Sequence, residues 1–274
     1  MKFHWMDRGR LNNPQEIKNL ANILDKYKYY SLLLTYHSKQ DDLLIKSLLA
    51  ADNNIKLKFM IAIRTYSISP EYMNMIYQSY NEMFPNKLML NILSGDLHKN
   101  EDSLENIPMF NDFFSSIENR YIYTEKWLEK FLKICNNKYL PEIVLSGHSE
   151  QSKNMSNKFN ITNLSMFNVY KYYIREKNKI INSKQMVAIS AIIRNTKQEA
   201  FEFIENNNTT KEYYKSCIFG TKDDVKNGLL KLFSKGATDI LIAPVINDNE
   251  YVEVHKIVKE ILDDNSNNWP SRIR

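Results

Sequence analysis

The chain alternates short apolar segments with longer segments that have helical patterning, from one end to the other. The expected strands are Lys2–Trp5, Tyr30–Leu34, Leu57–Ile63, Leu88–Leu93, Glu142–Leu145, Ile161–Met166, Met186–Ile193 and Ile240–Ala243. Eight strands, each followed by a helix, are the pattern of a parallel sheet closed into a barrel. A doubly wound open sheet would need an early phosphate loop, and no G-x-G-x-x-G follows the first strand. The sequence therefore predicts an α/β protein, a (β/α)8 TIM barrel that occupies residues 1–274 as one domain.

Helix signals support this alternation. The expected helices are Pro14–Lys26, Asp41–Ala51, Pro70–Met83, Thr124–Cys135, Val169–Ile181, Thr196–Asn206, Lys222–Lys235 and Tyr251–Leu262. Ser69 is a capping residue before Pro70, and Glu71 follows at the positive end of the helix dipole. Thr221 caps a later helix, and Gly236 is positioned to end it.

Composition narrows the range of partners. The net charge of +5 favours an anionic ligand but is too small and too evenly spread to indicate nucleic acid. Two cysteines provide neither a disulfide framework nor a metal cluster. We find no signal-peptide pattern and no apolar segment near the roughly 20 residues that a membrane helix needs. We therefore expect a cytoplasmic protein that binds neither membrane nor nucleic acid.

One apolar segment, LMLNIL, contains a carboxamide. A buried Asn91 must find hydrogen-bond partners or cost about 1–3 kcal/mol, so it is either a structural exception or a group that the strand presents to a ligand. Polar residues also follow three other expected strands. In a barrel these clusters would meet at the C-terminal mouth. The residues of interest are Tyr36, His37, Arg64, Asn91, Ser94, Gly147, His148 and Ser149.

The turn SGHSEQS is the most interpretable of these clusters. A small residue, a glycine and a hydroxyl before a helix can present backbone N–H groups and the helix dipole to an anion. Ser149 is equally well explained as an ordinary helix cap. His37 and His148 are suited to proton transfer or to a structural hydrogen bond, whereas His98 and His255 are expected to face solvent.

Longer blocks of the sequence resemble a known family. LKFMIAIRTYSISPEYMNMIYQSYNEMFPNKLMLNILSGD is similar to the third strand, helix and fourth strand of bacterial luciferase-like flavin-dependent monooxygenases. ENRYIYTEKWLEKFLKIC, PEIVLSGHSEQS and CIFGTKDDVKNGLLKLFSKGATDILIAPV resemble later parts of the family in the same order, and the alkanesulfonate monooxygenase branch is the most similar. The resemblance implies a barrel that binds reduced FMN at its mouth. Asn91 would face the flavin, with Ser94 on the same strand end. Tyr121, Gly147, His148 and Ser149 would hold the phosphate.

The sequence departs from that branch in its active-site groups. Lys39 stands where the branch has a cysteine, and Ala188 and Ser190 stand where it has an arginine and a histidine. Leu93 replaces the reactive cysteine of luciferases. The connections around residues 135–141 and 208–217 are short, which indicates a reduced insertion and lid. Sulfonate cleavage is therefore not expected.

Three functions fit these features. The first is an FMNH2-dependent, two-component monooxygenase that receives flavin from a separate reductase and acts on an organic substrate, with large, carrier-bound or peptide-bound substrates included. In that case Tyr36, His37 and Arg64 are the candidates for contacting substrate or flavin. The second is a non-catalytic flavin-binding subunit, and the third is a reductase that uses FMN or F420. The resemblance also implies a homodimer, or a heterodimer with a homologous subunit.

Overall fold

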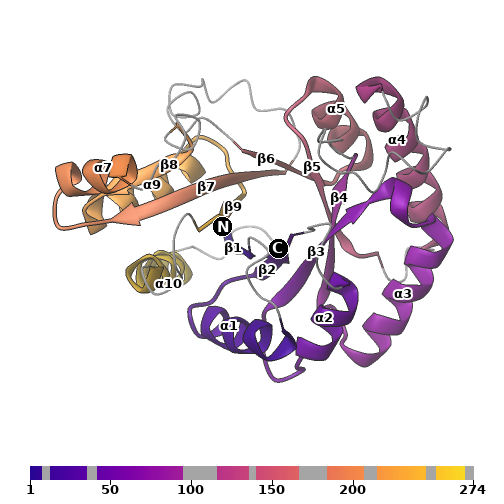
Figure 1. Ribbon diagram of the computed structural model, residues 1–274, viewed down its shortest axis with the longest axis horizontal. Helices are drawn as coiled ribbons and strands as arrows, with labels where there is room; N and C mark the ends of the chain where they lie inside the picture. Colours follow the sequence, from indigo (N-terminus) through magenta and orange to yellow (C-terminus); the bar gives the residue numbers. More distant parts are fainter. Residues whose placement is uncertain are drawn as a thin grey trace.

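A parallel barrel closes on itself in the computed structural model, which describes residues 1–7, 13–35, 42–94, 116–135, 140–166, 184–206, 215–244 and 251–268 (Figure 1). Its strands are β1 (Lys2–Asp7), β2 (Ser31–Leu34), β3 (Lys58–Arg64), β4 (Leu88–Leu93), β5 (Glu142–Ser146), β6 (Thr162–Met166), β7 (Gln185–Ile193) and β9 (Asp239–Ile242). Each strand pairs with the next in this order, and β9 pairs with β1 to close the ring. The predicted (β/α)8 barrel is confirmed.

Helices follow the strands and surround the ring. They are α1 (Pro14–Lys26), α2 (Leu43–Ala50), η1 (Thr65–Ser67), α3 (Pro70–Met83), α4 (Ile117–Ile134), α5 (Glu150–Phe159), α7 (Lys197–Asn206), α9 (Lys222–Ser234) and α10 (Val252–Asn268). The predicted caps Ser69 and Thr221 are confirmed, and Gly236 adopts a φ of 102° just after α9. The fourth helix begins at Ile117 and not at Thr124, because Ser116 caps it. The expected helix 169–181 lies outside the described residues.

Among the helices of the described segments, we find none whose length and apolar character would allow it to cross a membrane.

A strand that the sequence did not predict extends the wall of the barrel. The first half of β7, Met186–Ile189, pairs with β9, and the second half, Ser190–Ile193, pairs with β8 (Cys217–Gly220). The β7–β8 ribbon packs with α7 around its own small core, on the left of Figure 1. The prediction missed β8 because four residues are too few to show strand periodicity.

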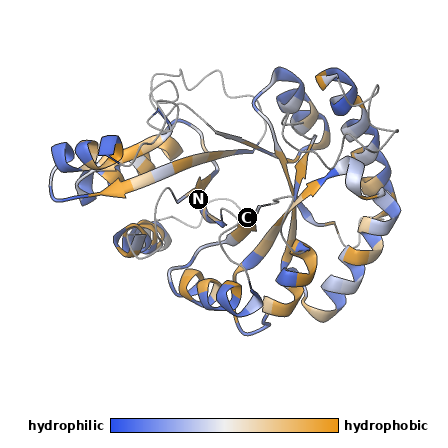
Figure 2. Cartoon of the chain, in the orientation of Figure 1, coloured by the Kyte–Doolittle hydropathy of each residue, from blue (hydrophilic) through white to orange (hydrophobic). Residues whose placement is uncertain are grey.

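The two faces of the sheet carry different side chains. Odd-numbered residues of β3 and even-numbered residues of β4 pack outward against the helices. The inward cluster is smaller and consists of Leu33, Met60, Met89, Val144, Leu164, Met186, Ala188 and Leu241. Figure 2 shows the resulting band of hydrophobic residues along the strands. At the N-terminal end of the ring, Glu142 accepts hydrogen bonds from Lys2, Lys58 and Tyr30.

Candidate functional site

Three adjacent strands bring polar residues to the C-terminal mouth of the barrel. The register aligns Asn91 of β4 with Val144 of β5, and Leu93 with Ser146. Met89 and Val144 belong to the inward cluster, and side chains alternate along a strand. Asn91 and Ser146 therefore point into the ring, and they lie near its mouth.

Asn91 is a buried donor. Its side chain is only 3% exposed, and its Oδ1 accepts a hydrogen bond from the Ser146 hydroxyl at 2.7 Å. In the part of the chain that the structure describes, nothing accepts a hydrogen bond from its Nδ2. A buried amide of this kind is costly unless a ligand or water uses its hydrogens. The carboxamide in the LMLNIL strand is thus half satisfied by protein and presents N–H groups to the interior.

The turn after β5 is shaped around Gly147. Its backbone N–H donates to the Leu164 carbonyl at 2.9 Å. A Cβ atom at this position would lie 2.5 Å from the Ser152 Oγ and 3.0 Å from the Tyr121 hydroxyl. Glycine is needed here for close approach, because any side chain would displace the groups that form the turn.

Ser149 joins this turn to α4. Its Oγ accepts a hydrogen bond from the Ser152 N–H at 3.2 Å, which caps α5, and donates to the Tyr121 hydroxyl at 2.9 Å. The helix-cap interpretation of Ser149 is therefore correct, and it is compatible with a binding role. Because the Ser149 hydrogen is used in this bond, the Tyr121 hydroxyl hydrogen is directed elsewhere, and no described residue accepts it.

His148 lies in the same turn and is half buried. Burial, followed by the nearby charge of Lys153, lowers the pKa of its imidazole below the ordinary value. The ring is therefore neutral at neutral pH. Lys153 is paired with Glu150 at 3.6 Å in the first turn of α5, so the groups that favour an anion here are the backbone N–H groups at the N-terminus of the helix.

Two residues behind the turn were missed by the sequence analysis. Asn163 of β6 is 1% exposed, and its Nδ2 lies 3.0 Å from the Ser152 Oγ, 3.3 Å from the Gly147 carbonyl and 3.4 Å from the Leu145 carbonyl. Ser152 is fully buried. The signal that could have identified Asn163 is the same as for Asn91, namely a carboxamide inside a short buried strand.

The remaining predicted residues have different outcomes. Arg64 ends β3, where its Nη1 donates to the Tyr66 hydroxyl at 3.0 Å, and Ser94 follows β4 in a half-buried position. Tyr36 and His37 lie outside the described residues, as do Lys39 and most of the two short connections. Over the described residues, we find no group of ligands able to hold a metal ion.

Two further predictions concern residues away from the turn. Ala188 and Ser190 do lie at buried positions of β7, and the Ser190 hydroxyl donates to the Ala243 carbonyl at 2.7 Å. The expectation that His255 faces solvent is wrong. It is 4% exposed, because α10 turns it towards Trp5 and Tyr29 on the outside of the ring.

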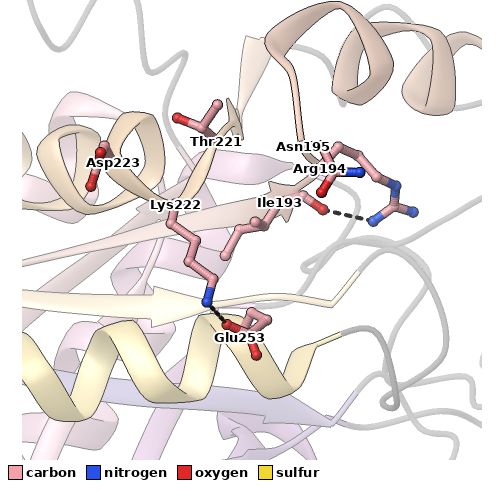
Figure 3. Close-up of a pocket in the computed structure, with 7 residues that line it drawn as sticks. All are labelled: Ile193, Arg194, Asn195, Thr221, Lys222, Asp223 and Glu253. Atoms are coloured by element: carbon pink, nitrogen blue, oxygen red, sulfur yellow. Dashed lines mark hydrogen bonds and ion pairs between the residues drawn. The ribbon is translucent and has the colours of Figure 1, made fainter.

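A pocket of about 450 Å³ lies beyond the mouth, between the ends of β7 and β8 and the start of α10 (Figure 3). Three of its four charged side chains, all but Asp223, have partners within the described structure. Lys222 pairs with Glu253, and the Arg194 guanidinium donates to the Ile193 carbonyl while pointing away from that pair (Figure 3). These groups do not converge on a common point.

A larger groove of about 1090 Å³ runs between α2 and α3. It is lined mainly by apolar residues of the two helices, and Arg64 lies at its margin.

Comparison with known proteins identifies the fold and no sequence relative. The sequence matches no protein-family model and no curated protein. Among solved structures, the long-chain alkane monooxygenase LadA has a TM-score of 0.74 at 14% identity, over 97% of this chain and 92% of that chain. EDTA monooxygenase (EmoA) from Chelativorans sp. BNC1 has a TM-score of 0.70 at 12% identity, over 97% and 94%. An F420-dependent secondary alcohol dehydrogenase, in complex with an F420-acetone adduct, has a TM-score of 0.68 at 10% identity, over 95% and 97%. The resemblance to the luciferase-like barrel is thus confirmed as one of fold, and it does not single out the sulfonate branch.

Proposed function

We propose that the protein is a flavin-dependent oxidoreductase of the luciferase-like type, and more specifically an FMNH2-dependent monooxygenase supplied by a separate flavin reductase. The observation that carries this proposal is the placement of two groups at one barrel mouth, namely the turn after β5 with the Tyr121 hydroxyl beside it and the buried amide donor of Asn91. The fold shared with LadA and EmoA supports the same conclusion.

The residues present fit FMN at both of its ends. Gly147 lets Ser152 and Tyr121 pack directly against the turn, since a Cβ there would lie 2.5 Å from the Ser152 Oγ and 3.0 Å from the Tyr121 hydroxyl, and this packing places the Tyr121 hydroxyl beside the proposed phosphate site. Tyr121 and the N-terminus of α5 would donate hydrogen bonds to that phosphate. Asn91 would donate from Nδ2 to an acceptor on the flavin ring system, with Ser94 close to the same end of β4.

Bound FMNH2 would supply the electrons with which oxygen is reduced during substrate oxidation. The protein would bind and orient the flavin. His148, neutral because its pKa is lowered, would add shape and no charge to the phosphate site. Arg64, Tyr36 and His37 remain the candidates for contacting an organic substrate, with Arg64 suited to an anionic group.

A reductase that uses FMN or F420 is the second candidate. The similar fold of the F420-dependent alcohol dehydrogenase favours it, since the same barrel there serves a deazaflavin. Ala188 and Ser190 provide no acid or base on β7, which is also compatible with a non-catalytic flavin-binding subunit. Oxygen uptake coupled to substrate would indicate the monooxygenase, and substrate reduction without oxygen uptake would indicate the reductase. Flavin binding without turnover would indicate the subunit.

The test of the flavin site is an anaerobic titration with oxidised and reduced FMN, followed by absorbance and fluorescence. We expect FMNH2 to bind, and the double variant Ser149→Ala, Tyr121→Phe to bind it at least about tenfold more weakly, because charge-assisted hydrogen bonds are lost. Ser69→Ala is the matched control, since it removes a helix cap far from the turn. Unchanged affinity in the double variant would refute the phosphate assignment.

We also propose a homodimer formed through α2 and α3. Ile45 and Leu49 of α2, and Tyr72, Met75 and Met83 of α3, are between 49% and 63% exposed around the apolar groove. A second copy of the chain presents the same exposed apolar residues and the same groove. A two-fold interface would therefore bury these residues on both copies.

Sedimentation velocity tests the dimer. We expect the wild type to sediment as a dimer and the variant Leu49→Glu, Met75→Glu as a folded monomer, because the charges would be buried at the interface. Ile23→Glu on α1, another exposed apolar position at 47%, is the control. A wild-type monomer at micromolar concentration would refute the homodimer and favour a homologous partner subunit.

A further inference from the structure

The amide group of Asn163 faces the turn after β5 from the outer face of β6, because Asn163 alternates with the inward-pointing Leu164. Two of its three neighbours, the Gly147 and Leu145 carbonyls, can only accept hydrogen bonds. The group that faces them must therefore be the NH2 and not the oxygen. The Oδ1 on the opposite side is buried and has no hydrogen-bond partner in the described structure. Only the donor half of Asn163 is in use.

This contact fixes the orientation of one peptide group. The Gly147 carbonyl points back towards Asn163, and the described residues contain no cis peptide bond. In a trans peptide the N–H points opposite to the C=O of the same unit. The His148 N–H is therefore directed away from the wall, and no described residue accepts a hydrogen bond from it.

We propose that Asn163 is a positioning residue for anion binding, because it holds the Gly147–His148 peptide with its N–H directed towards the phosphate. The inference rests on the proposed flavin site. Without the Nδ2 donor, the peptide could rotate and present the Gly147 carbonyl to the anion, which would replace attraction by repulsion. Ser152 contributes to the same arrangement, since its hydroxyl lies 3.0 Å from Nδ2 and also bounds the glycine site.

Riboflavin and FMN separate this role from a general structural one, because they differ only in the phosphate. We would measure the dissociation constants of both by flavin fluorescence for the wild type, Asn163→Ala and Asn163→Asp. We expect the wild type to prefer FMN. In both variants FMN affinity should fall about tenfold to a hundredfold, the usual loss for a hydrogen bond to a charged group. Riboflavin affinity should stay nearly unchanged.

Two features keep the experiment informative. Asn163→Asp places a carboxylate against two carbonyl oxygens and can fail to fold, whereas Asn163→Ala removes the donor without adding charge. Ser165→Ala is the matched control. Ser165 is also buried on the same face of β6, and its hydroxyl has no partner in the described structure. Its loss should leave both affinities unchanged.

The outcomes are distinguishable. A parallel loss of FMN and riboflavin binding in Asn163→Ala would mean that the residue only supports the fold, and would overturn the inference. Retention of the wild-type preference for FMN would overturn it as well. If the wild type binds FMN no better than riboflavin, the phosphate site itself is refuted, and the positioning role is refuted with it.

Discussion

Acid should destabilise the protein through one buried histidine, His255. Burial lowers the pKa of its imidazole from an ordinary 6.5 to about 4. The ring stacks on Tyr27, contacts Trp5, and its Nδ1 lies 3.0 Å from the hydroxyl of Tyr29, and none of these described neighbours is a carboxylate that would stabilise a charged imidazole. The folded protein therefore strongly prefers the neutral form.

The sign and size of the effect follow from linkage. Between pH 6.5 and about 4 the unfolded chain binds a proton at His255 and the folded chain does not, so stability falls as the pH falls through this window. At about 1.4 kcal/mol per unit of pKa, the full loss is about 3 kcal/mol, of which about 2 kcal/mol is lost by pH 5. That is a large share of the net stability of an ordinary domain.

Urea unfolding at a series of pH values between about 7.5 and 4.5 measures this loss. We expect the variant His255→Gln to be less stable than wild type near pH 7.5, because it loses ring packing. The difference should shrink by about 2 kcal/mol at pH 5, because glutamine does not titrate. Tyr29→Phe is the control: it removes the hydrogen bond and keeps the titrating ring, so its pH dependence should match wild type. A wild type and His255→Gln with parallel curves would refute the assignment.

Three further substitutions test the site and the opposite end of the barrel. Gly147→Ala should weaken FMN binding at least about tenfold with little effect on riboflavin, because its Cβ would displace Ser152; fluorescence titration of both ligands measures this. Asn91→Leu should weaken FMN and riboflavin by equal factors, since it removes a donor to the ring system that both share; a loss confined to FMN would contradict this placement. Glu142→Gln should lower the free energy of unfolding by about 1 kcal/mol, a small value because the side chain is 39% exposed, and leave flavin affinity unchanged. The pKa of Glu142 is about 2, because its lysine and tyrosine partners outweigh its burial, so its contribution is present above pH 4.5 and is lost as the pH falls towards 2.

Strand positions were predictable because the barrel demands apolar residues on both faces of each strand. Every expected strand is present with boundaries shifted by few residues. β8 was not predictable, because it pairs with the second half of β7, Ser190–Ile193, which extends beyond the ring of eight strands. His255 was misjudged because it is a polar residue on an amphipathic helix, and only the packing of α10 against Trp5 reveals that this position faces the core between the helix and the outer side of the ring.

The candidate site was predictable in its parts and not in its connections. Polar residues at strand ends identified Asn91, Gly147 and Ser149, and parallel strands must bring such ends to one mouth. The bond from Ser149 to Tyr121 joins residues that are 28 positions apart, and no local pattern encodes it. Asn163 was missed because the polar residues were collected at the ends of other strands and not within β6. A carboxamide inside a buried strand is nevertheless the same signal that identified Asn91.

The hydrogen-bond directions at the mouth constrain the ligand more than the residue types do. Three hydrogen-bond donors have no acceptor among the described residues. They are the Asn91 Nδ2, the Tyr121 hydroxyl and the His148 N–H. Two acceptor atoms of the same network are occupied: Asn91 Oδ1 by Ser146, and the Gly147 carbonyl by Asn163. Asn163 Oδ1, which has no partner, lies behind the turn and cannot reach the mouth. A site with several spare donors selects ligands rich in acceptors, because each unmatched donor costs free energy in the complex. A phosphate joined to a carbonyl-bearing ring system, as in FMN or F420, meets that condition, whereas a cationic or donor-rich ligand would leave these groups unpaired.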